Sequence, residues 1–263
     1  MDIGLRGRTA VVPGASAGLG LAIARAMAHE GANVVLAGRR GDLVREQADA
    51  LPSAIGVEVD LFSDGGPGLL VDRAVERFGD VDVLVLNGGG PPPGAAADVG
   101  PDQLRDAVGR LLVPHQRLVA AVLPGMRERG WGRVIAVGSS GVQQPVERLA
   151  LSNVGRAALA GYLKTLAGEV AGDGVTVNMV LPGRIDTDRV GTLDAAAAER
   201  TGTTVEQVRA KSESTIPAGR YGTPEEFAAV ALFLASAGAS TSPASRSAAT
   251  AGWCAPTETD VHP

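Results

Sequence analysis

Short apolar runs alternate with longer amphipathic or alanine-rich segments along most of this chain, and this alternation limits the folds that it can adopt. The short runs suit buried strands, and the segments between them are long enough for helices. Repeated strand–helix units predict a parallel sheet with helices on both faces, an α/β fold. The expected strands are Thr9–Val12, Asn33–Ala37, Ile55–Val59, Val81–Leu86, Arg133–Val137 and Val175–Val180.

The expected helices lie between and after these strands. They are Leu19–Glu30, Asp42–Leu51, Gly68–Phe78, Gln103–Arg129, Ser152–Ala171 and Pro224–Ser236, the last with Thr223 as its N-cap. Leu193–Ser214 differs from the other helical segments, because its alanine run and polar pattern predict one or two surface helices. The sequence pattern contains no linker, so we expect residues 1–263 to form a single domain.

Composition excludes several classes of partner. The net charge is −5 and the basic residues are scattered, which argues against nucleic acid as a partner. The single cysteine, Cys254, has no second cysteine for an intramolecular disulfide. No apolar run reaches the roughly 18 residues of a membrane span, and the first residues lack the apolar segment of a signal peptide. We therefore expect a cytoplasmic protein without a membrane segment.

The sequence PGASAGLG follows the first expected strand and opens the first expected helix. Gly14 would permit a tight turn, Gly18 would let the backbone approach a diphosphate, and Gly20 would let the helix pack closely on the sheet. The N–H groups and partial positive charge at the beginning of a helix favour a phosphate there. A glycine-rich turn alone is a weak signal in a chain with 36 glycines.

Further motifs follow in the order found in the short-chain dehydrogenase/reductase family, which the chain resembles from about Leu5 to Ser236. The family's TGxxxGxG motif appears at residues 13–20 with proline in place of threonine, and its NNAG segment appears as NGGG at residues 87–90. The resemblance implies a Rossmann-type, doubly wound sheet that binds a nicotinamide dinucleotide. We assign to the cofactor Gly14, Ser16, Gly18, Leu19, Gly20, Arg39, Asp60, Asn87, Gly88, Pro182, Gly183 and Thr187.

The choice of cofactor depends on the end of the second strand. An acidic side chain there accepts a hydrogen bond from the ribose 2′-OH of NAD and repels the 2′-phosphate of NADP, but this chain has AGRR at residues 37–40. Arg39 offers a planar set of donors to a phosphate. The alternative is that Arg39 and Arg40 are solvated loop charges. We expect NADP(H) to be favoured over NAD(H). By resemblance, Asp60 would contact the adenine and Thr187 the nicotinamide end.

The family's catalytic residues are matched only in part. The family uses a Tyr acid/base, a Lys four residues later, a Ser that binds the substrate oxygen and a helical Asn. Ser139 stands at the Ser position, whereas Ser152 occupies the Tyr position and Arg156 the Lys position. The Asn position falls on Leu111. We assign Ser139, Ser152 and Arg156 as the candidate catalytic residues, and no metal site.

This substitution changes the available chemistry. An aliphatic hydroxyl is a far weaker acid than a tyrosine with a pKa near 10, so Ser152 is a poor general acid. Arg156 stays protonated, but it can clamp ribose hydroxyls or a substrate oxyanion. His115 is an alternative proton donor, although its helix is expected at a subunit interface. Tyr162 is expected in the core, and Tyr221 in a structural turn.

The leading interpretation is an NADP(H)-dependent oxidoreductase that transfers a hydride to or from a ketone or alcohol with a non-standard active site. One alternative is a non-redox isomerase, cyclase or dehydratase that uses the same three residues to polarise an oxygen. Another is a cofactor-binding protein without turnover. We expect a small-molecule carbonyl or hydroxyl substrate, and the resemblance implies a homodimer or homotetramer.

Residues 239–263 depart from the family, whose chains end with a strand and a VTGxxxxxDGG segment. The tail of this chain has no strand pattern. Back-translation of Thr241–Ala255 with GC-rich codons, read one nucleotide earlier, can yield YVTGEPLRRDGGLVR. We therefore hypothesise that the tail is a frameshifted form of the family's ending, in the gene or in its recorded sequence, which resequencing the DNA tests.

Overall fold

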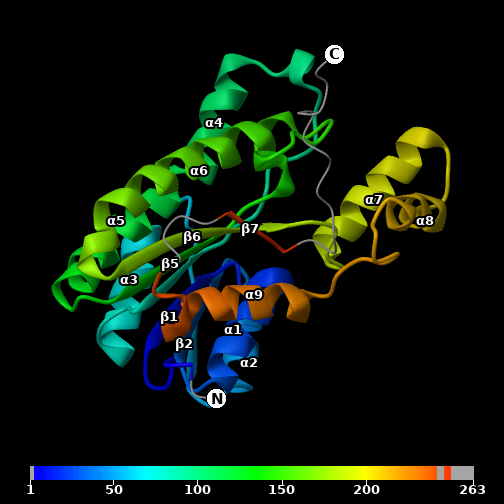
Figure 1. Cartoon of the computed structure of the whole chain (residues 1–263). Helices are drawn as coiled ribbons and strands as arrows, with labels where there is room; N and C mark the ends of the chain where they lie inside the picture. Colours follow the sequence, from blue (N-terminus) through cyan, green and yellow to red (C-terminus); the bar gives the residue numbers. More distant parts are fainter. Residues whose placement is uncertain (1–2, 242–245, 250–263) are drawn as a thin grey trace, which may run out of the picture.

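The computed structural model describes residues 3–241 and 246–249. Within them, seven parallel strands form one sheet in the order β3-β2-β1-β4-β5-β6-β7 (Figure 1). The order runs outward from β1 in both directions, so the predicted doubly wound sheet is confirmed. The strands are β1 Thr9–Pro13, β2 Asn33–Gly38, β3 Ala54–Glu58, β4 Val83–Leu86, β5 Gly132–Val137, β6 Val175–Pro182 and β7 Arg246–Ala249.

Helices cover both faces of the sheet. The α-helices are α1 Gly18–His29, α2 Gly41–Asp49, α3 Gly66–Phe78, α4 Pro101–Leu111, α5 Val113–Glu128, α6 Ala150–Val170, α7 Asp188–Thr201, α8 Val205–Ser214 and α9 Pro224–Ala235. Short 3₁₀ turns occur at Ala96–Asp98, Ser140–Val142, Ala171–Asp173 and Ala237–Ala239. In the described residues, no helix combines the length and the apolar character that crossing a membrane requires.

Two buried cores lie on opposite faces of the sheet because side chains alternate along each strand. Val11 contributes to the core under α3, α5 and α6, whereas its neighbours Ala10 and Val12 contribute to the core under α1, α2 and α9. All three side chains are fully buried. Burial on both faces explains why the strands read as continuous apolar runs in the sequence.

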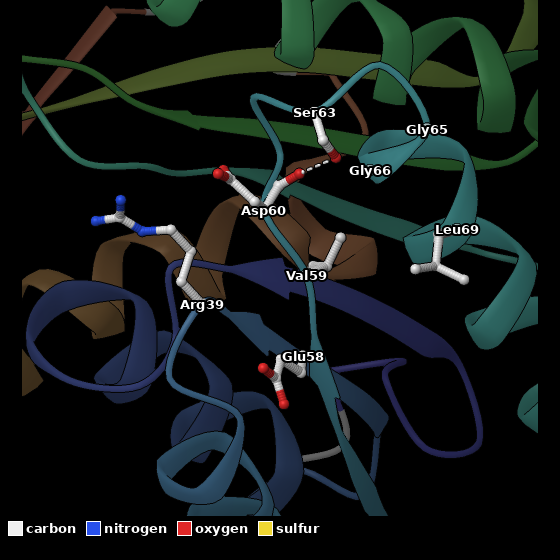
Figure 2. A pocket seen from close by; sticks show the side chains of 8 residues that line it. All are labelled: Arg39, Glu58, Val59, Asp60, Ser63, Gly65, Gly66 and Leu69. Carbon is white, nitrogen blue, oxygen red and sulfur yellow. Dashed lines mark hydrogen bonds between the residues drawn. The ribbon is translucent and has the colours of Figure 1, made fainter.

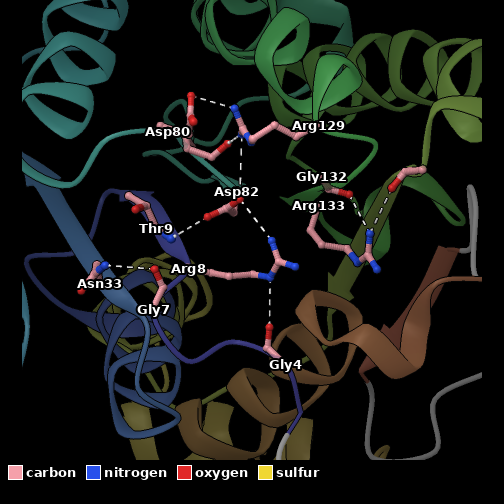
Figure 3. A network of polar contacts seen from close by, with 12 residues as sticks. Gly4, Gly7, Arg8, Thr9, Asn33, Asp80, Asp82, Arg129, Gly132 and Arg133 are labelled. Atoms are coloured by element: carbon pink, nitrogen blue, oxygen red, sulfur yellow. Dashed lines mark hydrogen bonds and ion pairs between the residues drawn. The ribbon is translucent and has the colours of Figure 1, made fainter.

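Polar contacts tie the amino ends of neighbouring strands together (Figure 3). A carboxylate oxygen of Asp82 accepts a hydrogen bond from the backbone N–H of Thr9 at 3.0 Å, and the other accepts one from Arg8 at 3.2 Å. Arg129 pairs with Asp80 at 2.7 Å beside them. These contacts hold β1 against β4 at the edge of the sheet opposite to the glycine-rich turn.

Two expectations about the helices need correction. The single helix expected over Gln103–Arg129 is two helices, α4 and α5, which meet at Leu112. Pro114 near the beginning of α5 lacks an N–H group, so it suits a new helix and disfavours a continuous one. Leu193–Ser214 contains two helices, as the sequence allowed, but α7 begins earlier, directly after its N-cap Thr187.

The tail contains a strand that the sequence did not predict. β7 pairs in parallel with β6, where Met179 lies opposite Arg246 and Pro182 opposite Ala249. The edge of β6 offers unpaired backbone groups, and a backbone ladder can form there without an apolar pattern in the added strand. Most of Thr241–Ala255, including Cys254, lies outside the described residues, so the frameshift hypothesis stays a prediction.

Candidate active site

The glycine-rich turn lies between β1 and α1 at the carboxyl edge of the sheet. Gly14 has φ +63° and Gly18 has φ +59°, a region that side chains other than glycine rarely adopt. A Cβ atom added to Gly20 would overlap the Gly14 carbonyl oxygen, so only glycine fits there. The positive φ of Gly14 fits the tight turn that the sequence predicted, whereas the approach of a diphosphate to Gly18 stays a prediction.

The side chain of Asn87, directly after β4, holds this turn in place. Its Nδ2 donates to the Pro13 carbonyl at 3.0 Å and to the Gly14 carbonyl at 3.3 Å. The amide is therefore occupied by the turn and shapes the candidate cofactor site through it. The sequence predicted Asn87 as a cofactor-binding residue but could not indicate this contact.

The first turn of α1 is open to a ligand. No side chain caps this helix at its N-cap Ala17, so its first N–H groups lack the partner that a cap would supply. Leu19 lies in this turn and packs partly against the core. Thr187 lies across from this turn: a Cβ atom added to Gly18 would be 3.8 Å from the Thr187 Cγ2 atom. A diphosphate between Gly18 and Thr187 would receive backbone hydrogen bonds and the positive end of the helix dipole.

A cavity of about 660 Å³ opens beside the carboxyl ends of β2 and β3 (Figure 2). Its lining includes Arg39 from the end of β2 and Asp60 from the segment after β3. The Asp60 carboxylate accepts a hydrogen bond from the Phe62 N–H at 3.0 Å, and Ser63 donates to the Asp60 carbonyl at 2.8 Å. The turn after β3 thus fixes Asp60 at the cavity, where the resemblance put the adenine.

A basic side chain meets the glycine-rich turn beside this cavity. Arg40 donates to the Ser16 hydroxyl at 2.8 Å, which brings the end of β2 to the turn. The sequence named Arg40 only as a neighbour of Arg39, so this contact adds a residue to the candidate phosphate site. Two acidic side chains, Glu58 and Asp60, line the cavity, and Glu58 pairs with Arg45 at 3.4 Å, which offsets its charge.

Two of the three candidate catalytic residues, Ser139 and Arg156, lie at the carboxyl end of β5. Ser139 follows β5, and its Oγ accepts a hydrogen bond from the Gly141 N–H at 3.1 Å. Ser152 and Arg156 lie one turn apart on α6, which puts them on the same side of that helix. The Arg156 guanidinium donates to the Val137 carbonyl, two residues before Ser139. No hydrogen bond joins the three side chains to one another among the described residues.

Asn153 supports this arrangement, and the sequence analysis missed it. Its Nδ2 donates to the Val146 carbonyl at 2.9 Å, and its Oδ1 accepts from the Val146 N–H at 3.3 Å. It thereby fastens the loop between β5 and α6. The only sequence signal for this role of Asn153 was its place as a polar residue beside Ser152 at the beginning of a helix.

Arg156 is 8 % exposed, and it is the most enclosed charge of the candidate site. Burial lowers its pKa to about 10, and the positive charge of Arg189 contributes in the same direction. Arg156 therefore keeps its charge at neutral pH. No carboxylate of the described residues forms an ion pair with it.

His115 lies inside the protein, near Gly88, instead of on an outer face of its helix. Its side chain is 2 % exposed, and Nδ1 lies 2.9 Å from the Leu111 carbonyl, an acceptor, so Nδ1 carries the proton. Nε2 is then an acceptor, and it is buried without a hydrogen-bond partner among the described residues. Burial lowers the pKa of His115 to about 4, with a further contribution from Arg156. A neutral imidazole at pH 7 is a poor proton donor.

The two tyrosines lie away from this group. Tyr162 packs against the core, as predicted. Tyr221 is buried and donates to the Asp194 carboxylate at 2.9 Å, in the segment where Gly222 pairs with Ile185. Its structural role is the one that the sequence indicated. β6 ends at Pro182, and Gly183 follows it and leads to Thr187, whose hydroxyl caps α7 by accepting from the Val190 N–H at 3.4 Å.

Comparisons with known proteins agree with this fold. Residues 14–252 match the family described as Enoyl-(Acyl carrier protein) reductase. The 3-oxoacyl-(acyl-carrier-protein) reductase FabG of Vibrio harveyi is 33% identical over 246 residues, which cover 88% of this chain and 91% of that protein. The structure of L-sorbose reductase from Gluconobacter frateurii with NADPH and L-sorbose has a TM-score of 0.89 and 32% identity, covering 96% of this chain and 98% of the other.

A second similar structure is that of a polyketide ketoreductase. A single-substitution variant of the actinorhodin polyketide ketoreductase with NADPH has a TM-score of 0.88 and 32% identity, and the match covers 93% of this chain and 96% of that one. These relatives are reductases, and the two structures contain NADPH. The chain belongs to the short-chain dehydrogenase/reductase family of oxidoreductases.

Proposed function

We propose that this protein is an NADP(H)-dependent reductase or dehydrogenase that acts on a ketone or alcohol, with Ser152 and Arg156 in place of the family's Tyr and Lys. The observation that carries the proposal is the open first turn of α1 behind the glycine-rich turn, with Ser16, Arg39 and Arg40 beside it. These residues fit a dinucleotide with a 2′-phosphate, because they combine backbone donors with guanidinium groups that form no ion pair among the described residues.

The preference for NADP(H) follows from charge. Neither Arg39 nor Arg40 forms an ion pair with a carboxylate of the described residues, so both are available to a phosphate dianion. The relatives solved with NADPH support use of this cofactor. We expect a lower dissociation constant for NADPH than for NADH in a fluorescence titration, and equal constants would contradict the preference.

The cofactor would supply the hydride, and the chain's own residues would bind and polarise the substrate. The Ser139 Oγ already accepts from the Gly141 N–H, and its hydroxyl proton has no partner among the described residues, so it can donate to a carbonyl oxygen. Arg156 contributes a fixed positive charge in an enclosed position, which would stabilise an oxyanion. Neither Ser152 nor neutral His115 is a good acid at pH 7, so we expect water or a substrate hydroxyl to supply the proton.

The test follows NADPH absorbance in the presence of a panel of carbonyl compounds. The proposal expects oxidation of NADPH only when a carbonyl substrate is present. Ser139→Ala should lower kcat/KM by about tenfold or more without changing the NADPH dissociation constant, because one hydrogen bond to the substrate oxygen is lost. Ser140→Ala, the neighbouring change, is the matched control and should keep the wild-type kcat/KM.

Two other outcomes would replace this proposal. Conversion of a substrate without a change in NADPH absorbance would indicate an isomerase, cyclase or dehydratase. Tight NADPH binding with no conversion across the panel would indicate a binding protein without turnover. We also propose that residues 1–263 form one domain and assemble as a homodimer or homotetramer, which light scattering of the purified protein tests.

A further inference from the structure

The direction of the Ser139 hydroxyl depends on Gly141. The Ser139 Oγ accepts a hydrogen bond from the Gly141 N–H at 3.1 Å and so caps the short 3₁₀ turn Ser140–Val142. This bond occupies an acceptor position of the oxygen and leaves the hydroxyl proton to point away from the turn. A residue that fixes Gly141 therefore also fixes the direction in which Ser139 can donate to a substrate oxygen.

The side-chain amide of Asn153 packs directly against Gly141. A Cβ atom added to Gly141 would overlap the Asn153 Oδ1 atom and would lie 3.3 Å from the Ser139 Oγ. Gly141 does not have a positive φ, so its backbone conformation does not require a glycine. The close approach of these two side chains does require one. The Asn153 amide, Gly141 and the Ser139 hydroxyl thus form a contiguous group.

Two hydrogen bonds to one residue hold the Asn153 amide in place. Its Nδ2 donates to the Val146 carbonyl at 2.9 Å, and its Oδ1 accepts from the Val146 N–H at 3.3 Å. The amide cannot rotate away from Gly141 without breaking both bonds. The Asn153 backbone is fixed as well, because its N–H donates to the Leu149 carbonyl at 2.8 Å. Asn153 is therefore a rigid support for Gly141.

The segment after β4 supports the same loop from the other side. The Gly94 N–H donates to the Arg148 carbonyl at 2.7 Å, and the Gly94 carbonyl accepts from the Ala150 N–H at 3.4 Å. Arg148 has φ +59°, and among the described residues it is the one residue other than glycine with a positive φ. Strain of this kind persists where the surrounding contacts enforce it, and it concentrates at functional sites. The loop that leads into α6 is thus held by contacts on two sides.

We propose that Asn153 is a positioning residue of the reaction, which acts through Gly141 to hold the Ser139 hydroxyl toward the substrate oxygen. Asn153 itself touches neither substrate nor cofactor in this role. A donor that is already aimed at the oxygen where negative charge develops lowers the barrier, because it does not have to reorganise during the reaction. This inference rests on the proposed reductase function.

The first test measures kcat/KM with a carbonyl compound that the wild-type protein reduces. Asn153→Ala should lower kcat/KM by about fivefold or more and leave the NADPH dissociation constant unchanged. In a Ser139→Ala background the same change should lower kcat/KM by less than about twofold, because the hydroxyl that Asn153 positions is absent. Losses that multiply in the double variant would show a general structural role and overturn the inference.

Thr165→Ala is the matched control for this series. It removes a side-chain hydrogen bond from the same helix, to the Gly161 carbonyl at 3.2 Å, and it should keep the wild-type kcat/KM.

Gly141→Ala tests the same contact from the other side. Its methyl group would displace the Asn153 amide, so kcat/KM should fall about as far as in Asn153→Ala. Adding Asn153→Ala should then lower kcat/KM by less than about twofold, because the truncated side chain leaves room for the methyl group. Wild-type kcat/KM in Gly141→Ala, or losses that multiply when the two changes are combined, would contradict the proposed contact.

Hydrogen exchange of the Gly141 amide, followed by NMR on the full chain without ligand, gives a readout that needs no turnover. Exchange should be about fivefold or more faster in both Ser139→Ala and Asn153→Ala than in the wild type, and unchanged in Thr165→Ala. Wild-type exchange in Asn153→Ala would overturn the inference, even where activity falls.

Failure of the proposed function looks different. In that case the wild-type protein oxidises NADPH with no carbonyl compound of the panel, whereas the exchange rates of the Gly141 amide still show whether Asn153 orders the Ser139 contact. The two failures are therefore distinguishable.

Discussion

The side-chain amide of Asn87 donates to the Pro13 carbonyl at 3.0 Å, so the end of β4 holds the glycine-rich turn that follows β1. The same amide also reaches the Gly14 carbonyl at 3.3 Å. The turn therefore has its shape before a ligand binds, which lowers the conformational cost of binding a diphosphate.

Replacing Asn87 with Ala removes this support. We expect the free energy of unfolding to fall by about 1–3 kcal/mol, because the carbonyls lose their donor. NADPH affinity should fall by about tenfold, since the turn must be ordered on binding. Asn33→Ala is the matched control: Asn33 donates to the Gly7 carbonyl at 3.2 Å at the other end of the sheet, and NADPH affinity should not change. Urea denaturation and fluorescence titration measure both quantities, and unaltered NADPH affinity in Asn87→Ala would contradict the role.

Gly20→Ala should abolish measurable NADPH binding. The new methyl group would overlap the Gly14 carbonyl oxygen and lie 2.7 Å from Asn87 Nδ2, so the turn must move. Gly68→Ala is the matched control, because its Cβ position in α3 meets no atom within 4 Å. Alanine there should stabilise the helix by about 0.5–1 kcal/mol and leave NADPH affinity unchanged. If Gly20→Ala keeps the wild-type affinity for NADPH, the cofactor does not bind at this turn.

Arg40→Gln should raise the NADPH dissociation constant by about tenfold and leave the NADH constant unchanged, because only NADPH carries the 2′-phosphate. The contact between Arg40 and the Ser16 hydroxyl at 2.8 Å puts the guanidinium beside the turn. Arg25→Gln serves as the control, since Arg25 is an exposed arginine of α1 that donates to Gln47. An equal loss of affinity for both dinucleotides would show that Arg40 does not bind the 2′-phosphate.

His115 makes stability depend on pH. Its pKa is lowered to about 4 in the folded protein, against an ordinary value near 6.5, so the unfolded chain binds the proton more readily. Its contribution to stability is present above pH 6.5 and is lost as the pH falls toward 4, by up to about 3 kcal/mol. Urea denaturation between pH 7.5 and 4.5 measures the slope.

His115→Gln should flatten that slope, because glutamine does not titrate. His29→Gln, a change at an exposed histidine of α1, is the control and should keep the wild-type slope. If the slopes of wild type and His115→Gln coincide, burial of His115 does not oppose its protonation.

The sequence alone determined the framework of the molecule. The strand positions followed from apolar runs such as Asn33–Ala37, because burial on both faces of a sheet leaves a local signature in the chain. The N-cap Thr223 and the glycine-rich turn could also be predicted from the sequence, since a cap and a turn depend on residues only a few positions apart. The structure bears these predictions out: Thr223 Oγ1 accepts from the Glu226 N–H at 3.2 Å.

Only the tertiary structure decided how distant residues meet. It put the Asn87 amide on the Pro13 carbonyl, 74 residues away, and it brought the Arg156 guanidinium of α6 to the Val137 carbonyl at the end of β5. It buried His115, and it paired Arg246–Ala249 with the edge of β6 despite a sequence without a strand pattern. Such contacts depend on the path of the whole backbone, and a local pattern carries no information about the partner that folding brings to it.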